Sequence, residues 1–201
     1  MKSKNTKLSD AAKKLSKKYD GLLDDIVLFG SSMKGKDRPK DIDVLIIFKK
    51  NVDKKIELEF RKELMLSKVD INSIVDINSI SLLELEGDDF IAKEGIYLEG
   101  FSLLKDKAIN ESLGFVSVAF IKYDLGNIKG SKRIRFYYAL QGRNENSGFL
   151  TSVGARRFAE SVIVCDYQVL ERIKPFFEQW NIEFIVTPAM IPKRLKHLLL
   201  T

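Results

Sequence analysis

The chain has 201 residues, of which 45% are hydrophobic and 31% are charged, and its formal net charge is +6. This composition is typical of a soluble globular protein with a core and argues against a disordered or membrane protein. No apolar run approaches the ~20 residues that span a bilayer, and the basic N-terminus lacks the apolar segment of a secretory signal. We therefore expect a cytoplasmic protein without membrane association.

In the first half, segments whose apolar residues have helical spacing alternate with short continuous apolar runs. The former predict helices and the latter predict strands. The run at residues 41–48 is nearly continuous, which is typical of a strand covered on both faces. Residues 70–81 contain the sequence Asp-Ile-Asn-Ser-Ile twice, and we interpret them as a third strand and the following turn. Predicted helices cover residues 8–19 and 52–67, predicted strands cover 25–29 and 41–48, and 81–104 is predicted as helix, turn and a short apolar segment.

Composition shifts near residue 108, and we place a domain boundary there, giving domains 1–108 and 109–201. The second domain is predicted to contain strands at residues 115–123, 161–165 and 182–186 and helices at 153–160 and 169–180. Residues 142–148 are predicted as a Gly/Asn-rich loop. The basic, Leu-rich tail at 192–200 suggests a docking helix or a contact between two copies of the chain. The fold class is therefore α+β.

Two polar motifs stand at the ends of apolar strands. Gly30-Ser31 ends the first strand, where free backbone N–H groups and a hydroxyl can meet phosphate oxygens. Asp41 and Asp43 begin the second strand, and residues two apart on a strand point the same way. Two carboxylates facing one point are suitable ligands for Mg²⁺. Either motif alone is ordinary turn chemistry, but together they indicate phosphoryl or nucleotidyl transfer.

The segment LFGSSMKGKDRPKDIDVLIIF resembles the DNA polymerase β-like nucleotidyltransferase superfamily, particularly its minimal archaeal and bacterial members. Their pattern is an apolar strand, Gly-Ser, a loop of roughly ten residues often containing Gly, then Asp-x-Asp and another apolar strand. Here nine residues separate Ser31 from Asp41, and Gly35 lies in the loop. The resemblance covers residues 20–104. It implies a mixed-sheet nucleotidyltransferase domain, followed here by a second small α+β domain of unassigned family.

Minimal members of the superfamily carry a third Asp on a later strand, followed about 18 residues on by a Glu-Gly-apolar segment. Asp76, followed by Glu94-Gly95, fits that spacing. Asp70, in the first copy of the repeat, fits it less well and remains the alternative.

The resemblance also implies roles for the matching residues. Asp41 and Asp43 would bind Mg²⁺ or Mn²⁺, and Asp76 would complete the second metal site and help deprotonate the acceptor hydroxyl. The remaining nucleotide-binding candidates lie around the first turn: Gly30 and Ser31 for the β- and γ-phosphates, Ser32 beside them, and Lys34 or Lys36 for the triphosphate charge.

The second half is the more basic part. Residues 111–201 hold 13 Lys and Arg against 8 Asp and Glu, and Arg suits bidentate phosphate contacts and stacking on bases. On a strand, Arg133 and Arg135 would share a face with Tyr137, and Arg143 follows. This face is a candidate nucleic-acid contact. The alternative is an ordinary solvated surface.

Isolated reactive side chains carry less weight. Cys165 is the only cysteine, which excludes an intrachain disulfide and a cysteine-cluster zinc site. It follows an apolar run and is most simply a small core residue. His197, the only histidine, is predicted to be a surface residue.

We therefore expect a metal-dependent enzyme that moves a nucleoside monophosphate from a nucleoside triphosphate to an acceptor hydroxyl, on RNA or on a partner protein. The protein acceptor has a precedent among minimal members that are antitoxins and adenylylate a partner HEPN toxin, although those usually lack so long a C-terminal extension. The competing hypothesis is a nucleotide- or RNA-binding module with the same fold and little catalysis.

Overall fold

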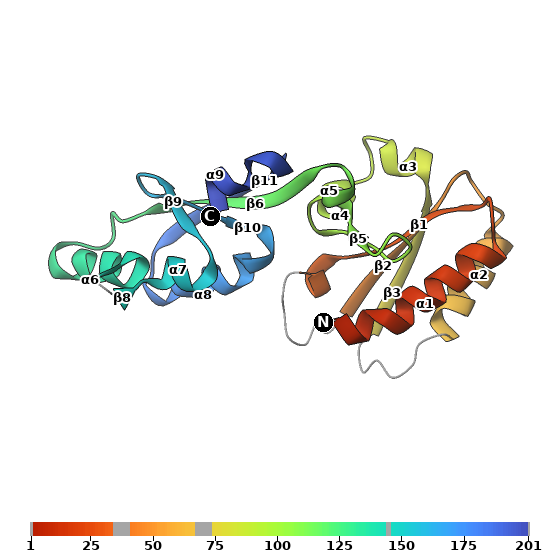
Figure 1. The fold of residues 1–201 in the computed structure, drawn as a ribbon, viewed down its shortest axis with the longest axis horizontal. Helices are drawn as coiled ribbons and strands as arrows, with labels where there is room; N and C mark the ends of the chain where they lie inside the picture. Colours follow the sequence, from red (N-terminus) through yellow and green to blue (C-terminus); the bar gives the residue numbers. More distant parts are fainter. Residues whose placement is uncertain (1, 34–40, 67–73, 144–145, 201) are drawn as a thin grey trace. The chain divides into compact units, whose positions relative to one another are not determined.

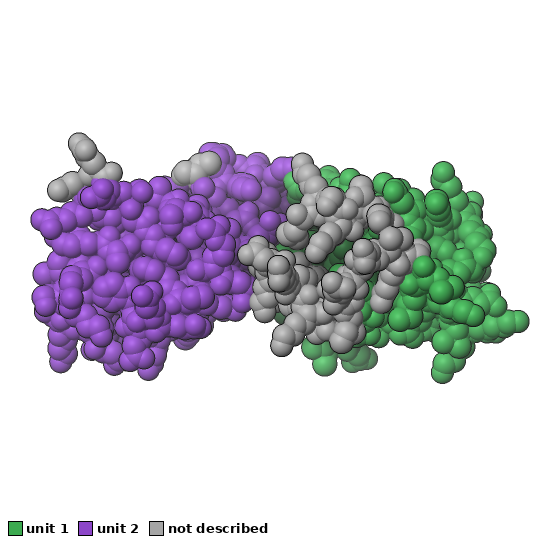
Figure 2. All heavy atoms as spheres, turned by 90° about the horizontal axis from the view of Figure 1, so that it is seen from below, with its two compact units in different colours: residues 1–112 green, residues 113–201 purple. Residues whose placement is uncertain are grey.

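The computed structural model describes residues 2–33, 41–66, 74–143 and 146–200, without the side chains of residues 2–7, 31, 32, 41 and 74. The chain divides into two compact units, residues 1–112 and 113–201 (Figure 2). The predicted boundary between residues 108 and 109 falls at the start of α5 (Ile109–Ser112). Each unit combines a sheet with helices, in agreement with the predicted α+β class.

The first unit is built on a five-stranded mixed sheet in the order β3-β2-β1-β4-β5 (Figure 1). β1 is antiparallel to β2, whereas β2 is parallel to β3. The strands are β1 (Leu23–Phe29), β2 (Asp41–Phe48), β3 (Ile74–Ser81), β4 (Phe101–Ser102) and β5 (Lys107–Ala108). A short 3-10 turn, η1 (Gly30–Met33), follows β1. The predictions of the first two strands and of a strand in the 70–81 repeat are confirmed.

Helices cover both faces of this sheet. On β2, Val44 and Ile46 pack with Phe60 of α2 (Lys54–Leu66) and with α1 (Lys2–Lys18). The intervening Leu45 packs on the other face with α3 (Leu82–Glu86) and α4 (Lys93–Glu99). This alternation confirms that β2 is covered on both faces, and it explains its nearly continuous apolar sequence.

Two polar arrangements join strands of this sheet to neighbouring elements. Ser81 ends β3 and caps α3 in a capping box, in which its side chain accepts from the Glu84 N–H and Glu84 accepts from the Ser81 N–H. Asp25 is buried on β1, where its Oδ1 accepts from Ser102 Oγ at 2.7 Å and its Oδ2 lies 3.1 Å from Lys105 Nζ. A buried carboxylate needs such partners, so this group joins β1 to β4 and the following turn.

The second unit has a four-stranded antiparallel sheet in the order β11-β6-β10-β9. The helices α6, α7 and α8 pack on one face, and the short α9 lies over β9 and β10 on the other (Figure 1). The strands are β6 (Phe115–Asp124), β9 (Arg156–Ala159), β10 (Val162–Asp166) and β11 (Glu183–Pro192), and the helices are α6 (Gly130–Gln141), α7 (Phe149–Val153), α8 (Leu170–Gln179) and α9 (Lys196–Leu200). The smaller elements are β7 (Gly142–Arg143), β8 (Asn146–Ser147), η2 (Tyr167–Val169) and η3 (Lys193–Leu195).

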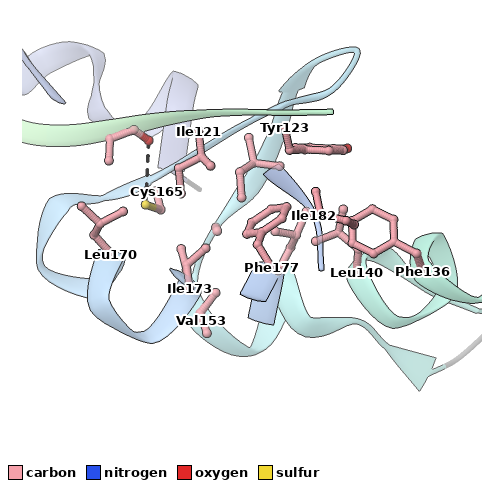
Figure 3. Close-up of a cluster of buried hydrophobic side chains, with 14 of the residues drawn as sticks. Ile121, Tyr123, Phe136, Leu140, Val153, Cys165, Leu170, Ile173, Phe177 and Ile182 are labelled. Carbon is pink, nitrogen blue, oxygen red and sulfur yellow. Dashed lines mark hydrogen bonds between the residues drawn. The ribbon is translucent and has the colours of Figure 1, made fainter. Parts of the chain in front are cut away.

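Aromatic rings from the sheet and from two helices form the core of this unit (Figure 3). Phe136 of α6 and Phe177 of α8 are fully buried, and both rings contact Tyr123 of β6. Cys165 is also buried and its thiol donates to the Ala119 carbonyl, in agreement with its prediction as a core residue. Burial raises the pKa of this thiol to about 12.

Two sequence interpretations of the second half are wrong. Residues 132–140 lie in the helix α6, not on a strand, because Phe136 and Leu140 bury one side at helical spacing. Residues 153–160 are not a helix: α7 ends at Val153, and Gly154, at φ +68°, takes the left-handed conformation that ends helices. β9 follows directly.

The remaining predictions for the second half are better matched. The strands expected at 115–123, 161–165 and 182–186 correspond to β6, β10 and β11, and the helix at 169–180 corresponds to α8, with Pro175 inside it. The expected loop at 142–148 contains the short β7–β8 pair. Among the described residues, no helix is both long and apolar enough to traverse a lipid bilayer.

Candidate active site

Gly30 lies directly against the carboxylate of Asp43. At φ +76°, Gly30 ends β1 and opens η1, and a Cβ built on it would lie 2.1 Å from Asp43 Oδ2. Real Cβ atoms essentially never come so close to another atom. Because glycine alone combines this positive φ with no Cβ, the residue type at position 30 is set by the neighbouring carboxylate.

Strand register brings a second carboxylate beside Asp43. Asp43 pairs with Phe29 on antiparallel β1 and with Asp76 on parallel β3. Asp43 and Asp76 each precede or follow a residue, Val44 or Val75, that packs on the face covered by α1 and α2. The two aspartates therefore lie on the opposite face, which α3 and α4 cover further along the strands. Asp43 is half-buried and Asp76 is exposed, with its Oδ2 accepting from Asn78 Nδ2 at 3.3 Å.

Asp41 begins β2 two residues before Asp43 and pairs with Ile74 in the same parallel ladder. Its side chain lies outside the described part of the structure, as do those of Ser31 and Ser32 in η1. Lys34, Lys36 and the alternative third aspartate, Asp70, lie outside the described residues altogether.

The donor set is suited to a hard divalent cation. Mg²⁺ and Mn²⁺ prefer carboxylate oxygens, and Asp43 and Asp76 place two carboxylates at paired positions of neighbouring strands. The described side chains contain no group of three His, Cys, Asp or Glu that could hold a metal ion. The two described carboxylates therefore fit such an ion as part of a larger set, to which Asp41 is the nearest addition along the strand.

The predicted nucleic-acid residues of the second unit are only partly brought together. On α6, Arg133 and Tyr137 are four residues apart and share one side, whereas Arg135 lies roughly 200° around the axis from Arg133. The strand interpretation, in which Arg133, Arg135 and Tyr137 share a face, is therefore wrong. Tyr137 also packs against the core.

Arg143 instead stands over the ring of Tyr138, with 5.0 Å from its guanidinium carbon to the ring centre. Tyr138 was missed because a strand alternation selects Tyr137. The spacing of Phe136 and Leu140, four residues apart, is the pattern that could have identified it.

The comparison with protein families agrees with the geometry of the first unit. Residues 11–99 match the model of the family described as Polymerase beta, Nucleotidyltransferase. This match includes η1, β2 and β3, and therefore Gly30, Asp43 and Asp76. No curated protein sequence matches the chain.

Solved structures with some similarity include a toxin–antitoxin complex with AMP-PNP, at 22% identity and TM-score 0.36, covering 52% of this chain and 78% of that chain. Another is the toxin–antitoxin MntA-HepT, at 19% identity and TM-score 0.34, covering 53% of this chain and 76% of that chain. These scores are too low to bear on fold or function. Residues 11–99 are therefore similar to the polymerase β nucleotidyltransferase family, and the mixed sheet of the first unit agrees with that similarity.

Proposed function

We propose that the first unit transfers a nucleoside monophosphate from a nucleoside triphosphate to an acceptor hydroxyl, with Mg²⁺ or Mn²⁺ as cofactor. The observation that carries the proposal is the contact between Gly30 and the Asp43 carboxylate, with Asp76 at the neighbouring register position. It supports the proposal because a turn that could bind phosphate would lie beside two carboxylates on one side of the sheet.

In this reaction the turn binds the triphosphate. The backbone N–H groups of Gly30 and Ser31 at the start of η1 would donate to β- and γ-phosphate oxygens, with Ser32 and Lys34 as further contacts. Asp41, Asp43 and Asp76 would hold the cation, which when bound neutralises charge on the reacting phosphate.

Asp76 is the group available to the acceptor. Because its side chain is exposed, it can accept the proton of an incoming hydroxyl as the oxygen attacks the α-phosphorus. The new bond joins the acceptor oxygen to the α-phosphorus, and the bond to the bridging oxygen breaks. Pyrophosphate leaves with the electron pair, so atoms and charge balance.

The acceptor is an RNA or protein hydroxyl, and the experiment separates these. The purified chain is incubated with each of the four nucleoside triphosphates labelled at the α-phosphate, with Mg²⁺ or Mn²⁺ and total RNA. We expect label on RNA, on the chain itself or on a co-purifying protein. The double variant Asp41→Ala/Asp43→Ala should abolish it, whereas Asp88→Asn, which alters an exposed carboxylate after α3, should leave it unchanged.

The competing function is a nucleotide- or RNA-binding module without catalysis. It predicts nucleotide binding that needs Gly30 but no label on any acceptor under any of these conditions. Label that persists in the double variant would instead overturn the assignment of Asp41 and Asp43.

A further inference from the structure

The helix α6 presents a row of cationic and aromatic side chains to solvent. Lys132, Arg135 and Tyr138 follow one another at intervals of three residues, so they lie along one side of the helix. Arg143, just beyond the helix, extends the row by standing over the Tyr138 ring. All four side chains are exposed, Tyr138 by 44%.

This row has no counter-charge within its own segment. Residues 125–143 contain five Lys and Arg and no Asp or Glu. Within the described part of the chain, none of Lys132, Arg135 and Arg143 forms an ion pair with a carboxylate. Cations in the first turn of a helix also oppose its dipole, and the first turn of α6 has no acidic residue. A bound polyanion would reduce both the repulsion among these cations and their unfavourable interaction with the helix dipole.

The chemistry of the row favours nucleic acid over a lipid surface. A helix that lies on a membrane needs a free apolar face, but Phe136 and Leu140 of α6 are fully buried in the core. The row instead alternates phosphate-binding cations with a tyrosine ring, on which an unpaired base can stack. From Lys132 to Tyr138 the helix rises about 9 Å, at about 1.5 Å per residue. This length equals the rise of two to three nucleotides of a stacked strand, at about 3.4 Å each.

We propose that the row Lys132, Arg135, Tyr138 and Arg143 binds a single-stranded nucleic acid, with Lys132 and Arg135 on phosphates and Tyr138 with Arg143 against a base. If the proposed function holds, this strand supplies the acceptor hydroxyl. The binding itself does not depend on catalysis.

The test measures binding of a fluorescent single-stranded RNA to the full chain by anisotropy, over a salt series, in EDTA and without nucleotide. Arg135→Gln should weaken binding and reduce the slope of log K against log salt by about 0.7, the value for one lost phosphate contact on a single strand. Tyr138→Ala should weaken binding about tenfold with the slope unchanged. Tyr138→Phe keeps the ring and should bind nearly as tightly as the unmodified chain.

Arg133→Gln is the matched control, because it removes the same charge from the other side of the same helix. It should keep the affinity within about twofold and lower the slope by less than Arg135→Gln. Equal effects of the two substitutions, equal binding of duplex RNA, or preferential binding of anionic vesicles would overturn the proposal. Because metal and nucleotide are absent, a catalytically inactive chain would still bind RNA. Label transfer without RNA binding would overturn this inference alone.

Discussion

Gly30 and Asp43 are so close that the carboxylate occupies the space a side chain at position 30 would need: the built Cβ lies 2.1 Å from Oδ2 and 3.1 Å from Cγ. This contact joins the turn after β1 to the start of β2. It makes the position of Asp43 depend on the absence of one methyl group.

Gly30→Ala should therefore lose activity as well as stability. The positive φ costs an L-residue about 1–2 kcal/mol, and displacement of the carboxylate by even 1 Å can cost about 100-fold in rate. Gly21→Ala separates the two effects, because Gly21 has φ +80° but nothing within 4 Å of a built Cβ. The midpoint temperature of thermal unfolding should fall in both variants, whereas the rate of nucleotidyl transfer should fall only in Gly30→Ala. Equal activity loss in both would contradict the role of the contact.

Asp76→Asn should lower transfer without lowering stability. An exposed carboxylate contributes little to folding, whereas loss of a general base typically costs about 10²–10⁴-fold. Single-turnover rates and thermal unfolding are measured on the same samples. Asn78→Ala, which removes the hydrogen bond to Asp76, is the control and should change the rate only a few-fold. Normal activity of Asp76→Asn would contradict the role of Asp76 and would favour Asp70 as the third aspartate.

The first unit could largely be predicted from sequence, because β1 and β2 are buried on both faces and stand next to polar residues with few other roles. The continuous apolar run at residues 44–48 indicates a strand covered on both faces, whether or not its partners are known. The pairing of Asp43 with Asp76 on adjacent strands could not be predicted from apolar patterns. It depends on the parallel register of β2 and β3, which the intervening chain and packing determine.

The second unit was harder to predict because its local patterns are ambiguous. In the sequence KRIRFYYAL, charged and apolar residues alternate with a period of two at first, although only Phe136 and Leu140, four apart, are buried. Ile134 is 53% exposed, so the residue that favoured a strand contributes little to the core. Gly154, by contrast, is the residue type that commonly ends a helix, and α7 ends directly before it.

Stability of the first unit should depend on pH through the α3 capping box. Hydrogen bonds from the Ser81 backbone and side chain lower the pKa of Glu84 below its usual 4.5. The stabilisation from this charge is complete above the unfolded pKa and is lost as pH falls through the lower folded value. Ser81→Ala should cost about 1 kcal/mol near neutral pH, as cap removal typically does.

Denaturant unfolding of the unmodified chain and Ser81→Ala, measured across this acid range, checks the prediction. The difference between them should shrink as Glu84 is protonated. Glu86→Gln, at the other end of α3, should not alter it. A difference that grows at low pH would contradict the linkage.

Cys165 should be unreactive while the second unit is folded. Its pKa of about 12 results mainly from burial, so roughly one thiol in ten thousand is ionised at about pH 8, against a substantial fraction of a free thiol. Iodoacetamide should label the native chain at least about 100-fold more slowly than a free cysteine. Labelling should become complete in concentrated guanidinium chloride. Rapid native labelling would indicate that β10 opens readily.

The central claim is nucleotidyl transfer, and the position of the label on the nucleotide tests it most directly. The chain is incubated with acceptor and Mg²⁺ or Mn²⁺, once with the nucleotide labelled at the α-phosphate and once at the γ-phosphate. Nucleotidyl transfer predicts that the α-label joins the acceptor while the γ-label appears as pyrophosphate in equal amount. Transfer of the γ-label to the acceptor, or pyrophosphate formation that survives Asp41→Ala/Asp43→Ala, would contradict it.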